Sequence, residues 1–127
     1  MKTILLILLG FIQANSLSQG KTRLSNGDAI VGIWYCEALD KSTFKITKEP
    51  KAVYTAVIIK SSKTEHIGKS ALKDVVYNEK KKIWEGTIIT AESRKELNGV
   101  LELENENEMR VTGSLLWFKK TYIWERK

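Results

Sequence analysis

Hydrophobic and polar residues alternate with a period of two along much of the chain. In the last third, Leu97, Leu101 and Leu103 fall on one face of an extended segment, whereas Glu102 and Glu104 fall on the other. Successive side chains of a β-strand point to opposite sides, so this alternation predicts strands with one buried face. No segment of ten or more residues carries a convincing helical period, and we therefore expect an all-β protein.

Eight such segments follow one another and are separated by short polar turns. We predict strands at residues 30–36, 43–48, 53–59, 71–77, 83–90, 96–104, 109–115 and 118–125. Eight strands joined in sequence form a meander, and a meander of this size closes into an eight-stranded antiparallel up-and-down barrel. A two-sheet sandwich is the alternative. Glycines inside the strands favour a barrel, whose strands coil at bends: Gly32, Gly86, Gly99 and Gly113.

The first eighteen residues have the pattern of a secretory signal peptide. Lys2 supplies a positive start, residues 4–12 form an apolar run, and small residues follow at Ala14, Ser16 and Ser18. The run is too short to span a bilayer, which takes about 20 apolar residues. We expect cleavage after Ser16 or Ser18 and export to the periplasm or the medium. A buried N-terminal helix is the alternative interpretation.

The pattern divides the chain into a signal peptide (1–18), a flexible lead-in (19–29) and a single β-barrel domain (30–127). The one cysteine, Cys36, does not follow the apolar run directly, so we expect no lipoprotein. A single cysteine also forms no internal disulfide. Cys36 is either a free thiol or a small buried hydrophobe, and its place in an apolar strand favours burial.

The net positive charge of the chain bears on which partners we expect. The chain has 21 Lys and Arg residues against 15 Asp and Glu residues, and its basic clusters stand at residues 80–82, 94–95 and 119–120. Nucleic-acid binding by a small barrel needs basic residues interleaved with exposed aromatic ones, whereas the aromatic residues here alternate inward. We expect no nucleic-acid partner and weak contact with anionic surfaces of the cell envelope. The sequence specifies no oligomeric state.

Residues suited to catalysis or metal binding are sparse. His66 is the single histidine and stands in a polar loop, where we expect an exposed side chain. One histidine and one cysteine do not make a zinc site. Ser-x-x-Lys occurs at residues 42–45 and 70–73, but residues three apart on a strand face opposite ways. The carboxylates of residues 102–108 fit a solvated edge. We expect no enzyme, metal or cofactor.

The two ends of the barrel domain carry a structural signature. Gly32 and Trp34 lie in the first strand, and Arg126 follows the last strand. In a closed barrel these strands are neighbours, so the guanidinium of Arg126 can cover the indole of Trp34. The indole would plug the barrel floor, and Gly32 would let the neighbouring backbone approach closely. The combination resembles the signature of lipocalins and their calycin relatives.

A second resemblance rests on four segments in a fixed order. They are residues 30–34 (Ile-Val-Gly-Ile-Trp), 84–88 (Trp-Glu-Gly-Thr-Ile), 109–113 (Met-Arg-Val-Thr-Gly) and 121–126 (Thr-Tyr-Ile-Trp-Glu-Arg). This order is similar to the bacterial domain-of-unknown-function family 2147, small exported proteins with a lipocalin-like barrel. The resemblance covers residues 30–126. It implies the fold and export, and it implies no biochemical activity.

Aromatic residues dominate the expected barrel interior. Phe44, Trp84, Tyr122 and Trp124 are spaced as inward-facing residues, and they are our candidates for contact with a ligand. Small barrels either fill their interior with side chains or hold one small ligand. We predict a barrel that binds a small apolar or amphipathic ligand. The alternative is a filled barrel that serves as an envelope structural or protein-interaction factor.

Overall fold

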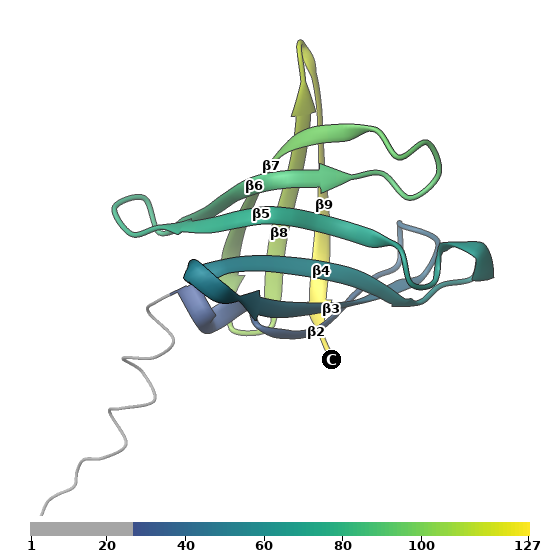
Figure 1. Cartoon of the computed structure of the whole chain (residues 1–127), viewed down its shortest axis with the longest axis horizontal. Helices are drawn as coiled ribbons and strands as arrows, with labels where there is room; N and C mark the ends of the chain where they lie inside the picture. The colour runs from purple at the N-terminus through teal and green to yellow at the C-terminus, as the bar shows by residue number, and fades with distance from the viewer. Residues whose placement is uncertain (1–26) are drawn as a thin grey trace, which may run out of the picture.

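The computed structural model describes residues 27–127 as one closed antiparallel barrel (Figure 1). Its strands are β2 (Gly32–Cys36), β3 (Ser42–Glu49), β4 (Val53–Lys60), β5 (Ser70–Asn78), β6 (Ile83–Ile89), β7 (Glu96–Asn105), β8 (Glu108–Leu115) and β9 (Phe118–Arg126). Each strand pairs with the next along the chain, and β2 also pairs with β9. This closing pair confirms the predicted up-and-down barrel and excludes the two-sheet sandwich.

The described residues also form three short 3₁₀ helices: η1 (Gly27–Ile30) precedes β2, whereas η2 (Pro50–Ala52) and η3 (Thr64–His66) lie between strands. The predicted signal peptide, residues 1–18, lies outside the described residues, as does the lead-in up to residue 26. The end of that lead-in differs from the expectation, because Gly27 and Ala29 are buried within η1. The described part of the chain has no helix long and apolar enough to cross a membrane.

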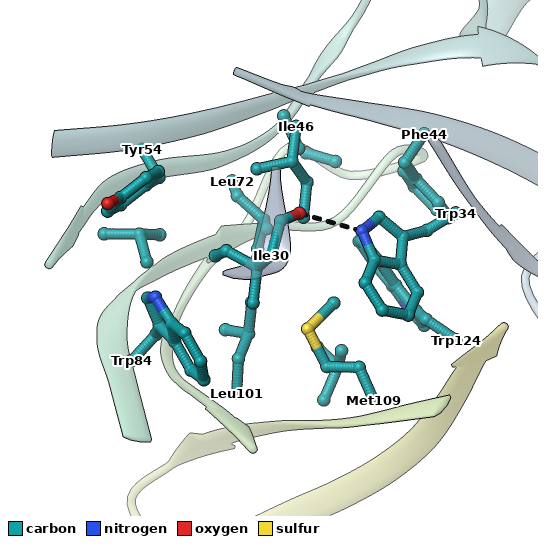
Figure 2. Close-up of a cluster of buried hydrophobic side chains, with 14 of the residues drawn as sticks. Ile30, Trp34, Phe44, Ile46, Tyr54, Leu72, Trp84, Leu101, Met109 and Trp124 are labelled. Atoms are coloured by element: carbon teal, nitrogen blue, oxygen red, sulfur yellow. Dashed lines mark hydrogen bonds between the residues drawn. The ribbon is translucent and has the colours of Figure 1, made fainter. Parts of the chain in front are cut away.

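Two buried indoles explain why η1 is ordered. Nε1 of Trp34 donates a hydrogen bond to the carbonyl oxygen of Ile30, and Nε1 of Trp84 donates one to the carbonyl oxygen of Gly27, both at 2.9 Å. These bonds hold η1 across one end of the barrel, which we call the closed end. Figure 2 shows Ile30 in the middle of the surrounding core, with its carbonyl bonded to Trp34.

The predicted signature residues meet at the closed end. Arg126 lies opposite Trp34 in the β2–β9 pair, with its guanidinium carbon 4.3 Å from the centre of the indole. Gly32 has a φ of 140°, a conformation that favours glycine, and a Cβ there would lie 3.1 Å from Nη1 of Arg126. The guanidinium also donates to three backbone carbonyl oxygens, those of Ala29, Val31 and Glu106.

Cys36 is buried on β2, as its apolar strand predicts. Burial raises the pKa of its thiol. The thiol therefore stays protonated at neutral pH, and a protonated, enclosed thiol is a poor nucleophile.

Candidate functional site

A cavity of about 290 Å³ lies at the other end of the barrel, which we call the open end. Most of its wall is apolar, and seven strands, β3 to β9, contribute to it: Phe44, Ile58, Ala71, Ile88, Leu97, Val111 and Trp124. The closed half is filled by large side chains such as Trp34 and Trp84, whereas inward positions here include Ala71 and Gly113. Because these residues are small, the open half keeps a space close to the lower size limit of ligand sites, about 300 Å³.

Two stacked aromatic rings belong to the core and also line the cavity. Phe44 on β3 and Trp124 on β9 stack with their ring centres 3.9 Å apart and their planes 7° from parallel. Both residues line the cavity, together with Tyr122. Nε1 of Trp124 is buried and has no hydrogen-bond partner among the described residues. Three of the four predicted interior aromatics are thus brought together at the cavity wall.

Trp84, the fourth, does not line the cavity. It is buried inside the barrel as predicted, but at the closed end, where it donates to Gly27 and packs 4.7 Å from the ring of Tyr77. The alternation along β6 specifies which face a side chain takes, but not its height along the barrel. The sequence therefore predicted correctly that Trp84 lies inside the barrel, but it did not predict that Trp84 lies away from the cavity at the open end.

His66 is buried, contrary to the expectation of an exposed loop histidine. It lies in η3, is 1% exposed and lines the cavity. Its Nδ1 is 3.8 Å from Oδ2 of Asp40, and its Nε2 is 3.4 Å from Oε1 of Glu92. Neither nitrogen has a hydrogen-bond partner among the described residues. The imidazole thus lies within 4 Å of two carboxylates that come from different turns.

Contacts between loops explain why His66 is enclosed. The loop of residues 61–69 is held against the turn between β2 and β3, because Ser62 donates from its backbone nitrogen and its hydroxyl to the carbonyl oxygen of Asp40, each at 2.9 Å. Lys63 reaches Glu92 at 3.3 Å on the opposite side. The hydrogen bond from Lys63 lowers the pKa of Glu92, so this carboxylate stays ionised beside His66. Because its partners come from distant turns, local sequence gave no signal of this burial.

Lys120 is a cavity-mouth residue that the sequence analysis missed. It lines the cavity, and its Nζ lies 5.6 Å from the ring centre of Tyr122. A signal was available, because Lys120 has the same parity as Tyr122 and Trp124 along β9. No group of three or more His, Cys, Asp and Glu side chains in residues 27–127 is arranged to hold a metal ion. The open end thus combines an apolar cavity with a mixed-charge mouth.

Comparison with known proteins yields one match. A family model described as an uncharacterized protein conserved in bacteria, DUF2147, matches residues 20–126. No curated protein and no solved structure matches the chain. The match includes every strand of the barrel and the four segments that resemble this family, and so the chain belongs to DUF2147.

Proposed function

We propose that this chain is an exported, soluble barrel that binds one small apolar or amphipathic ligand in the cavity at its open end, without a catalytic step. The observation that carries the proposal is the apolar cavity above the stacked rings of Phe44 and Trp124. Space lined by apolar side chains lowers stability because packing contacts are missing. A ligand that fills the space restores those contacts, so binding is favourable.

Polar groups around the cavity favour an amphipathic ligand. His66 and Nε1 of Trp124 are buried without hydrogen-bond partners among the described residues, and a buried unpaired group costs free energy. Lys120 and Glu92 add charge at the mouth. An apolar body inside the barrel with a polar group near the mouth would use both features. The cavity also argues against the alternative, a barrel filled entirely by its own side chains.

A titration with 1-aminoanthracene, an uncharged fluorophore that brightens in apolar surroundings, tests the proposal. Ala71→Leu extends a side chain into the cavity, whereas Val76→Leu adds bulk to the outer wall of the same strand. The wild-type chain should take up the probe saturably. Uptake should weaken at least about tenfold in Ala71→Leu and stay unchanged in Val76→Leu. Absence of saturable uptake, or equal uptake by Ala71→Leu, would contradict the proposal.

A further inference from the structure

The turn between β8 and β9 exposes large apolar side chains. Leu116 and Trp117 are 84% and 90% exposed, and Phe118 is 51% exposed. We call residues 115–118 the apolar tip. Figure 1 shows this turn projecting away from the rest of the barrel. Apolar side chains that are exposed to water do not stabilise the folded chain. Exposed apolar patches of this kind commonly mark a surface that contacts another molecule or a membrane.

Local folding does not explain the composition of the tip. Two hairpin turns at the closed end, residues 79–82 and 106–107, carry only charged or amide side chains, and the third connection there, Pro50–Ala52, has no large apolar side chain. Leu116 has a φ of 57°, a conformation that favours glycine, and two-residue hairpin turns commonly place glycine at such a position. The tip thus holds a residue that is unfavourable for its backbone and for its exposure to water. Both disadvantages would be offset by an apolar partner.

Positive charge surrounds the tip. Lys119 and Lys120 follow it directly in β9. A groove of about 440 Å³ joins the tip to the β6–β7 turn and is lined by Lys95 as well as by Leu116 and Trp117. The two acidic residues of that turn region are already paired, Glu92 with Lys63 and Glu96 with Lys73. The lysines near the tip therefore present a positive surface that is complementary to anionic headgroups.

We propose that the apolar tip docks on an anionic lipid bilayer, with Leu116 and Trp117 in the interface and the neighbouring lysines against headgroups. Tryptophan favours the boundary between water and hydrocarbon, and peripheral binding combines apolar insertion with electrostatic attraction. Phe118 and Lys120 also line the cavity, so docking brings the cavity mouth to the bilayer. The tip docks whether or not the cavity holds a ligand, and the proposal is thus independent of the proposed function.

Tryptophan fluorescence of the full chain with vesicles provides the first test. Trp34, Trp84 and Trp124 are buried, and residues 1–26 contain no tryptophan, so a change of environment at the surface reports on Trp117. Vesicles containing phosphatidylglycerol should shift the emission to the blue, and added salt should weaken the effect. Pure phosphatidylcholine vesicles should shift it less. Absence of a shift with phosphatidylglycerol overturns the proposal.

Co-sedimentation of variants with the phosphatidylglycerol vesicles provides the second test. Leu116→Gly with Trp117→Asn removes the apolar tip and supplies residues that suit a hairpin turn, so the barrel stays folded. Its vesicle binding should be at least about tenfold weaker than that of the wild type. Lys119→Gln should weaken binding about fivefold. The control, Val76→Ser with Val100→Ser, removes exposed apolar residues from the outer wall and should bind like the wild type.

All these chains carry the same N-terminal segment, so differences between them report on the tip. Equal sedimentation of the tip variant and the wild type overturns the proposal. It is also overturned if neither chain binds vesicles and the tip variant converts a dimer to a monomer. In that case the tip would cover a second copy of the chain.

Discussion

The two ends of the barrel satisfy their buried polar groups in different ways. At the closed end, the indoles of Trp34 and Trp84 donate to η1, and Arg126 donates to three carbonyl oxygens. At the open end, both nitrogens of His66 and Nε1 of Trp124 have no hydrogen-bond partner among the described residues, although carboxylates of Asp40 and Glu92 lie within 4 Å of the imidazole. Paired polar groups stabilise a fold, whereas buried unpaired ones cost free energy. The closed end is therefore the better-satisfied part of the barrel, and the open end is where we propose that a ligand binds.

Two tryptophans, one from each end, give the largest expected contrast. Trp34→Ala removes a fully buried ring and should lower the free energy of unfolding by about 3–5 kcal/mol. Trp117→Ala removes an exposed ring and should change it by less than about 0.5 kcal/mol. Urea denaturation followed by circular dichroism measures both. Similar costs for the two substitutions would show that the ends do not differ as described.

Arg126 tests whether the closing contact itself is stabilising. Arg126→Ala should cost about 2 kcal/mol, because it removes charged hydrogen bonds and the cover over Trp34. Lys127→Ala is the control, since Lys127 lies over the partly exposed ring of Tyr35 and should cost less than about 0.5 kcal/mol. In a double-mutant cycle, Arg126→Ala and Trp34→Ala should fall short of additivity. If the two substitutions lowered the free energy of unfolding additively, Arg126 and Trp34 would not be coupled.

Substitutions at two buried alanines allow the packing of the closed half and the open half of the barrel to be compared. Ala56→Leu places bulk in the filled core and should cost about 1–2 kcal/mol. Ala71→Leu places the same bulk in the cavity and should cost less than about 1 kcal/mol. Thermal unfolding monitored by circular dichroism ranks the two. The reverse order would mean that the open half is packed as tightly as the closed half.

The smallest expected effect concerns pH at the closed end. The hydrogen bond from Tyr54, and then the one from Lys48, lower the pKa of Asp28 below its ordinary value of 3.8. A carboxyl group with a lowered pKa stabilises the fold above its ordinary pKa, and this stabilisation is lost as the pH falls through the lowered pKa. The effect is small because Asp28 is half exposed.

Asp28→Asn removes this titration. Between neutral pH and pH 3.8 or below, the wild-type chain should lose more stability than Asp28→Asn does, as measured by urea denaturation at each pH. If the free energy of unfolding of the two chains changed with pH in parallel, the Tyr54–Asp28 hydrogen bond would not contribute to the pH dependence of stability.

The sequence predicted the features that depend on alternation and on chain order. Alternating residues gave the strands, and neighbouring first and last strands gave the contact between Trp34 and Arg126. It did not predict features that depend on height along the barrel or on contacts between loops. Trp84 and Trp124 have the same inward pattern, yet only Trp124 lines the cavity. His66 is buried through contacts with distant turns, which no local pattern encodes.

Native mass spectrometry of the chain purified from its own cell envelope tests the central claim most directly. We predict a chain that begins after Ser16 or Ser18 and carries one small molecule, and we predict that Ala71→Leu abolishes this adduct while Val76→Leu retains it. A chain that carries no small molecule, or an adduct that persists in Ala71→Leu, would contradict ligand binding at the open end. A chain that still begins at Met1 would contradict export through a cleaved signal peptide.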